Sequence, residues 1–100
     1  MLRLPERLML DDAPAALAAL AEGLRGEGAA ATATVDASGL LRFDSAALAV
    51  LLECRRVAQA AGRGFAVHGA PAKLVELARL YGLAALLPLG AAPAVLSEPR

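Results

Sequence analysis

The stretch VDASGLLRFDSAALAVLLECRRVAQAAGRGFAVHG, from Val35 to Gly69, decides the fold. It begins at the end of a run of small and β-branched residues (30–36) that predicts a strand. An Ala- and Leu-rich segment over 46–61 then predicts a helix that ends at Gly62, and the apolar run 64–69 between glycines is typical of a buried strand. A strand, a helix and a strand in this order indicate a right-handed crossover between parallel strands.

The predicted central helix has one apolar face and one polar face. The apolar residues recur at the helical period. The apolar face consists of Ala47, Leu48, Leu51, Cys54, Ala58 and Ala61, and the polar positions are Glu53, Arg56, Gln59 and Arg63.

The sequence on either side continues the alternation of strands and helices. Residues 2–10 predict a small hairpin or one bent edge strand around Pro5. Asp11 and Asp12 precede a helix that begins near Pro14 and ends at Gly26 and Gly28. Its apolar face carries Leu17, Leu20 and Leu24.

A third helix is predicted from Pro71 to the stop signal Gly82. Its inward face is expected to carry Leu74, Leu77, Ala78 and Tyr81, and its outward face Lys73, Glu76 and Arg79. Residues 83–89 predict an edge strand or a docking turn, and 91–100 a flexible tail. We therefore expect one α/β domain over 1–90, with about four strands in a mixed or mostly parallel sheet and helices packed on it.

The composition limits the classes of partner. Ten basic and ten acidic residues give no net charge, which argues against nucleic acid or an anionic membrane surface as a ligand. An aromatic content of 3% is too low for a base-stacking surface. No transmembrane segment or signal peptide is expected, and the single Cys54 suits a reducing compartment, so we expect a cytoplasmic protein. An Ala- and Leu-rich, uncharged chain favours protein partners or self-association.

Catalytic and cofactor chemistry find little support. Ser45 lies in FDSAA, without the glycines of a nucleophile elbow, and the only histidine is His68. Cys54 and His68 are the only soft metal ligands and belong to different predicted elements. GEGAAA (26–31) follows a helix and precedes a strand, the reverse of the order in a dinucleotide-binding site. We expect no enzyme activity, no cofactor and no metal.

Asp44 and Ser45 stand where the central helix begins. Either side chain can cap the free N–H groups of the first turn. The partial positive charge of a helix N-terminus would also tolerate a phosphate on Ser45, so this hydroxyl is a possible phosphorylation site. Ala46, Ala49 and Val50 follow, and we expect them to form a smooth apolar surface that a partner can approach closely.

The stretch 35–69 resembles the STAS domain family, which includes anti-sigma-factor antagonists and regulatory modules of transporters. The similarity covers roughly residues 2–89 and includes the order strand, Asp, loop, Asp-Ser, helix, Gly, strand. The ending APAKLVELARLYGLAALLPL (70–89) is similar to the last helix of the small STAS subunits of Mla-type phospholipid transporters. The resemblance implies a cytoplasmic subunit, peripheral to the inner membrane, that binds the ATPase of an ABC transporter.

The resemblance also implies where the partner binds. Ser45 matches the hydroxyl residue that lies at the ATPase-binding surface in that subfamily. The expected partner surface consists of Asp44, Ser45, Ala46, Ala49, Val50, Lys73, Glu76 and Arg79.

The alternative is an anti-sigma-factor antagonist that binds a kinase-type anti-sigma factor. Those proteins typically carry Asp-Ser-Ser-Gly-Leu, in which the second serine is phosphorylated, and this chain has Ala46 at that position.

Overall fold

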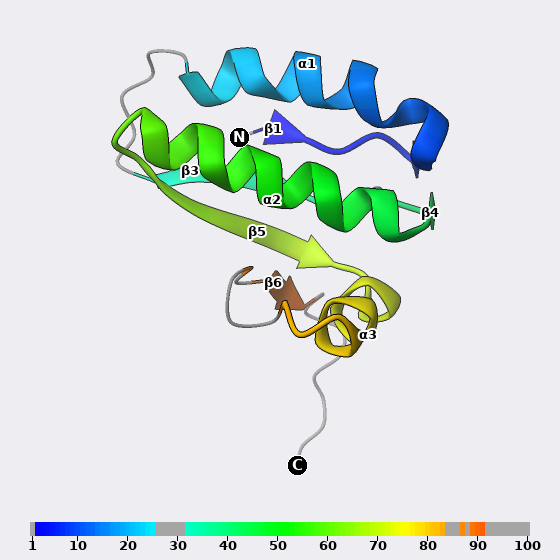
Figure 1. Ribbon diagram of the computed structural model, residues 1–100. Helices are drawn as coiled ribbons and strands as arrows, with labels where there is room; N and C mark the ends of the chain where they lie inside the picture. Colours follow the sequence, from blue (N-terminus) through cyan, green and yellow to red (C-terminus); the bar gives the residue numbers. More distant parts are fainter. Residues whose placement is uncertain (1, 26–31, 84–86, 88, 92–100) are drawn as a thin grey trace.

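The computed structural model describes residues 2–25, 32–83, 87 and 89–91 (Figure 1). Within them the chain forms short strands, one 3-10 helix and α-helices that alternate with the strands of a sheet. The elements are β1 (Leu2–Arg3), β2 (Arg7–Leu8), η1 (Leu10–Asp12), α1 (Ala13–Arg25), β3 (Thr32–Asp36), β4 (Arg42–Phe43), α2 (Ser45–Ala60), β5 (Gly64–Ala70), α3 (Ala72–Leu80) and β6 (Leu89–Ala91).

The main sheet has four strands in the order β1-β3-β5-β6, and all neighbours are parallel. The pair β3–β5 lies at its centre, with Val35 opposite Val67 and Asp36 opposite His68. Helices α1 and α2 lie side by side, and α3 lies beside β6 (Figure 1). The predicted α/β fold, with about four mostly parallel strands, is confirmed.

The N-terminal segment is expected to form a small hairpin or one bent edge strand; no hairpin forms, and β1 is an edge strand of the main sheet. β1 is parallel to β3 in the main sheet, whereas β2 is parallel to β4 in a separate two-stranded sheet. The carbonyl oxygen of Glu6 accepts hydrogen bonds from the backbone N–H groups of Leu41 and Arg42 at 2.8 and 2.9 Å. The segment around Pro5 therefore crosses from one sheet to the other, and each strand pairs with a residue more than thirty positions away.

The hydrophobic core lies between the sheet and α1 and α2. The predicted buried faces of α1 and α2 are confirmed at Leu20, Leu24, Ala47, Leu48, Leu51, Cys54 and Ala58, whereas Ala61 follows the end of α2 and is exposed. Largely aliphatic side chains from β1, β2, β3, β5 and α3 complete the core. No polar or charged residue is buried within the described part of the chain.

The ends of the elements agree with most of the stop signals. Gly82 has φ +71°, a left-handed conformation that favours glycine, and lies two residues after the end of α3. The glycines expected to end α1, at 26 and 28, lie outside the described residues. β6 begins at Leu89, the last residue of the expected edge strand, and reaches Ala91, the first residue of the expected tail. Residues 92–100 lie outside the described part.

The length and polarity of the described helices bear on whether any of them could cross a membrane. Each is too short, or too rich in polar residues, to span a lipid bilayer.

Candidate functional site

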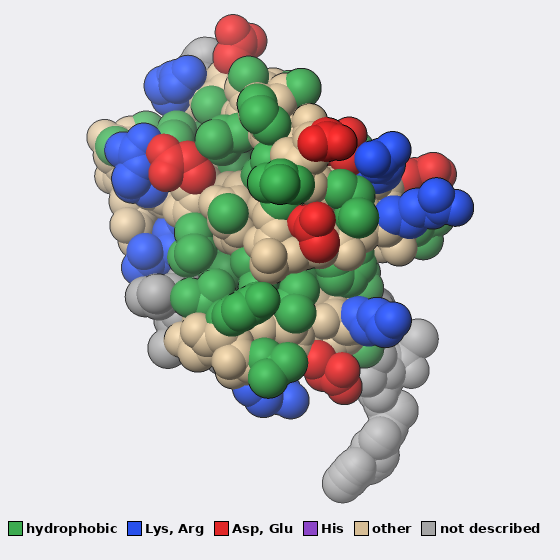
Figure 2. Space-filling model, turned by 45° about the vertical axis from the view of Figure 1, so that its right-hand side comes forward, with side chains coloured by type: hydrophobic (Ala, Val, Ile, Leu, Met, Phe, Trp, Pro, Cys, Tyr) green, Lys and Arg blue, Asp and Glu red, His purple; other side chains and the backbone are tan. Residues whose placement is uncertain are grey.

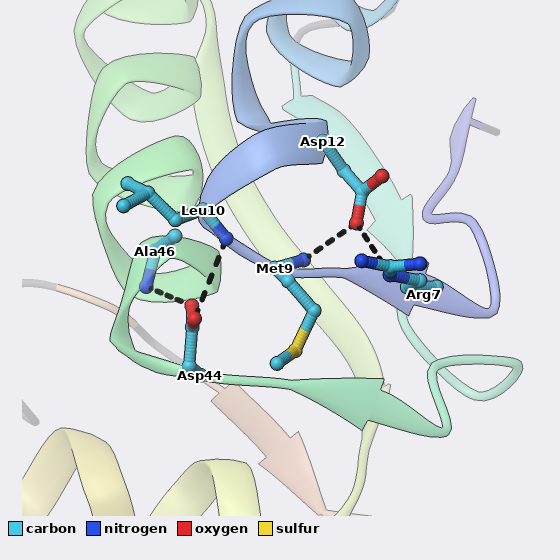
Figure 3. Close-up of polar contacts among 6 residues, drawn as sticks. All are labelled: Arg7, Met9, Leu10, Asp12, Asp44 and Ala46. Carbon is cyan, nitrogen blue, oxygen red and sulfur yellow. Dashed lines mark hydrogen bonds and ion pairs between the residues drawn. The ribbon is translucent and has the colours of Figure 1, made fainter.

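The Asp44 carboxylate joins the start of α2 to the 3-10 helix near the N-terminus (Figure 3). Asp44 has an extended backbone (φ −132°, ψ −163°), and its Oδ1 accepts a hydrogen bond from the backbone N–H of Ala46 at 2.8 Å. Its Oδ2 accepts a longer bond, 3.3 Å, from the backbone N–H of Leu10. Asp44 is therefore the N-cap of α2, which leaves the exposed Ser45 side chain outside the cap.

The turn that carries Leu10 is also held from its other side (Figure 3). Asp12 Oδ2 accepts a hydrogen bond from the backbone N–H of Met9 at 2.9 Å and lies 3.1 Å from Nε of Arg7. The two aspartates thus hold the same turn, and Leu10 remains 71% exposed beside the start of α2.

A groove of about 490 Å³ lies between the start of α2 and α3, and we call it the α2–α3 groove. One part of its lining is polar and the other apolar. The polar residues are Asp44, Ser45, Lys73 and Glu76. The apolar residues are Phe43, Leu77, Leu80 and Tyr81.

The apolar part of this lining is open to solvent. Leu80 is 80% exposed and Tyr81 59% exposed, whereas Phe43 and Leu77 are half-buried. Figure 2 brings forward the end of the molecule that holds the start of α2 and α3, and there hydrophobic side chains lie among charged ones. Exposed apolar area rimmed by polar groups is typical of a protein-binding surface.

The structure brings half of the expected partner residues into one groove. Asp44 and Ser45 come from the start of α2, and Lys73 and Glu76 from the outward side of α3. Ala49 is exposed one turn further along α2. Arg79 is exposed on α3 but does not line the groove.

The prediction that Ala46 and Val50 lie on the surface is wrong. Ala46 and Val50 are only 8% and 3% exposed, so they belong to the interior and not to a smooth outer surface. The reason is that α2 packs along α1 and η1 as well as against β5, which buries a wider arc of the helix than one face. The accessible small residues at the start of α2 are therefore Ser45 and Ala49.

The apolar half of the groove was missed at the sequence level. Tyr81 was expected on the buried face of the third helix, but α3 ends at Leu80 and Tyr81 takes the C-cap position (φ −89°, ψ 6°). A side chain beyond the last helical residue no longer follows the helical period. Leu80 was the available signal, since a large apolar residue outside the predicted inward face has no core to enter.

The potential catalytic and metal-binding residues do not converge. His68 is exposed on β5 and does not line the groove that contains Ser45. Burial raises the pKa of the Cys54 thiol to about 11, so this side chain stays protonated in the core. In the ranges that the structure describes, no three His, Cys, Asp or Glu side chains are grouped to hold a metal ion.

A second polar cluster lies at the carboxyl ends of β1 and β3. Asp36 Oδ1 accepts a hydrogen bond from the backbone N–H of Ser38 at 2.9 Å, and its Oδ2 lies 3.9 Å from Nε of Arg3. These contacts, with the Ser38 hydrogen bond the larger cause, lower the pKa of the Asp36 carboxyl. The contacts within the cluster are local and order the loop after β3.

Comparison with known proteins identifies the family. No curated protein matches the chain. A family model described as "Mlab, STAS domain" matches residues 1–88, which include α2, the groove and all elements before β6. The match agrees with the parallel sheet and the Asp-Ser helix start described above, and we conclude that this chain belongs to the MlaB-type STAS domain family.

Proposed function

We propose that this chain is a non-enzymatic accessory subunit that binds the cytoplasmic ATPase of a phospholipid-transport ABC complex. STAS domains are small regulatory or accessory domains that contact other proteins. The partner would hold the chain at the cytoplasmic side of the inner membrane. The observation that carries the proposal is the α2–α3 groove, which Ser45 lines together with the exposed side chains of Leu80 and Tyr81.

Three features support the groove as the contact surface. Ser45 is exposed because Asp44 supplies the helix cap, so the hydroxyl is available to a partner. Burying Leu80 and Tyr81 would remove a large exposed apolar area from water, which is a main driving force of association. Lys73 and Glu76 provide charges of both signs at the groove, which can fix the orientation of a partner.

The test is affinity capture of the tagged chain from its native cells, with a matched set of variants. We expect the wild-type chain to recover an ABC ATPase together with its permease. Ser45→Arg places a bulky cation in the groove and should abolish recovery, whereas Ser45→Ala should retain most of it. Gln59→Arg introduces the same side chain at an exposed position near the far end of α2 and serves as the control.

Two outcomes would overturn the proposal. Recovery of a histidine-kinase-like ATPase without transporter subunits would favour the anti-sigma-factor antagonist instead. Stoichiometric phosphate on Ser45, abolished by Ser45→Ala, would point to the same partner-switching function. The thermal midpoint of Ser45→Arg must stay close to that of the wild type, since a collapse would show a folding defect and call for Ser45→Gln in its place.

A further inference from the structure

The α2–α3 groove combines an apolar wall with two exposed charges. Lys73 and Glu76 are exposed and lie three residues apart on α3, so they project from the same side of the helix. Neither forms an ion pair among the described residues, whereas Arg7, Arg56 and Asp36 each do. Both charges are therefore available to another chain.

The apolar wall lies next to these charges. Leu80 and Tyr81 are two of the large hydrophobic side chains that remain exposed in the described part of the chain, and both line the groove with Leu77. Aromatic side chains are enriched among the contacts that dominate binding energy, and such contacts are surrounded by a polar rim. One large apolar side chain of a partner would fit this arrangement.

The walls of the groove favour a helix as the occupant. α3 has its backbone hydrogen bonds inside the helix, and β4 is only two residues long and already pairs with β2. An added strand would find no extended ladder of free backbone groups here, whereas a helix docks through its side chains alone.

We propose that the groove receives a short amphipathic helix of the partner protein. One Leu, Met or Phe of that helix contacts Leu77, Leu80 and Tyr81. A carboxylate within one turn of it pairs with Lys73, and a cation on the same side pairs with Glu76. The identity of the partner rests on the proposed function, but the chemistry of its docking segment does not.

Photo-crosslinking in native cells tests the location. The photoreactive residue p-benzoylphenylalanine replaces Tyr81 in the full chain, and a control chain carries it at Ala15, an exposed position on α1. We expect an adduct from position 81 and none from position 15. The crosslinked partner peptide should contain a large apolar residue with an acidic and a basic residue within one helical turn.

The outcomes separate this inference from the proposed function. An ATPase that crosslinks from position 15 but not from position 81 overturns the helix-in-groove inference and leaves the transporter function standing. A different protein at position 81, with the expected peptide pattern, supports the groove and overturns the transporter function. A position-81 peptide without that pattern, or no adduct at position 81, overturns the groove inference.

Charge reversal tests the pairing. Lys73→Glu and Glu76→Lys should each weaken binding of the captured partner by roughly tenfold, mostly through the rate of dissociation if the pairs are desolvated. Glu22→Lys makes the same kind of change at an exposed position on α1, outside the groove, and should have little effect. Replacing the partner's carboxylate residue with lysine should restore binding to the Lys73→Glu variant but not to the Glu76→Lys variant. If binding is not restored while both proteins remain folded, the proposed pairing is wrong.

Discussion

One oxygen of the Asp44 carboxylate caps α2 while the other accepts a hydrogen bond from the backbone N–H of Leu10, 34 residues earlier in the chain. A single side chain thus connects the start of the central helix to the turn before α1. The longer of the two bonds, 3.3 Å to Leu10, is the weaker one.

Asp44→Ala should lower the free energy of unfolding by about 1–2 kcal/mol, because the Ala46 N–H loses its acceptor. Asp44→Asn keeps an amide oxygen for the cap and should cost only a fraction of this. Ser45→Ala should stay within about 0.5 kcal/mol of the wild type, since the exposed hydroxyl is not the cap. Urea unfolding followed by circular dichroism measures all three, and a larger loss for Ser45→Ala than for Asp44→Ala would refute this assignment.

Gly69 lies on β5 where the loop after β3 packs against that strand. It has φ +71°, and a Cβ added there would lie 3.0 Å from the Cβ of Ser38. Gly69→Ala should therefore destabilise the fold by roughly 1–3 kcal/mol, from the backbone conformation and the contact together. Gly39→Ala is the control, because its added Cβ would meet no atom within 4 Å.

A double substitution separates the two causes. Ser38→Gly removes the Cβ that the new methyl group would meet, so Ser38→Gly combined with Gly69→Ala should cost less than the sum of the single changes. Thermal unfolding measures the change in the free energy of unfolding for each variant. If the change for the double variant equals the sum of the two single changes, only the backbone conformation at Gly69 matters.

The lowered pKa of the Asp36 carboxyl predicts that the stability of the fold falls at low pH. Its pKa is lowered in the fold by the Ser38 N–H and by Arg3, so the charged form stabilises the native state. This contribution is present above the ordinary pKa of 3.8 and is lost as the pH falls through the lower folded value. The difference in unfolding free energy between wild type and Asp36→Asn should therefore shrink below about pH 4.

The comparison variant for that titration is Asp11→Asn. Asp11 is exposed and has no hydrogen bond or ion pair among the described residues. An equal pH dependence for the two variants would contradict a special role for Asp36.

Cys54 reports on the opening of the core. Its thiol is fully buried, and burial raises its pKa to about 11, so both access and ionisation oppose reaction. Dithiodipyridine at about pH 8 should label the folded protein orders of magnitude more slowly than the urea-unfolded chain, whose thiol has its ordinary pKa of 9.0. Fast labelling in the absence of urea would show that α2 separates from the sheet readily.

The buried Cys54 thiol should also lower the stability of the fold at high pH. Because the raised pKa disfavours the thiolate in the fold, ionisation stabilises the unfolded chain once the pH exceeds its ordinary value of 9.0. The wild type should lose stability relative to Cys54→Ala between about pH 9 and pH 11. A difference that does not change over this range would indicate a thiol less buried than the structure has it.

Long periodic segments made most of the fold predictable. The central helix repeats its apolar residues over several turns, and Leu51, Cys54 and Ala58 are buried as that period requires. The two-residue strands β2 and β4 have no period to read, so their pairing, and the failure of the hairpin, follow only from the tertiary structure.

The candidate site was predictable only in its polar half. Asp44 and Ser45 carry a local helix-start signal, and Lys73 and Glu76 lie where the period of α3 puts them outward. The burial of Val50 depends on the packing of α1 and η1 alongside α2, which a single helix period does not reveal.

The hydrogen bonds from Leu41 and Arg42 to the carbonyl oxygen of Glu6 bear on how binding would proceed. They fix the strand that leads into α2 against the N-terminal segment, so the beginning of the helix is already ordered in the free protein. A partner that meets Ser45 then loses little conformational entropy on this side of the interface. Preorganisation of this kind favours rapid, rigid-body association, and any slow ordering step in complex formation would belong to the partner.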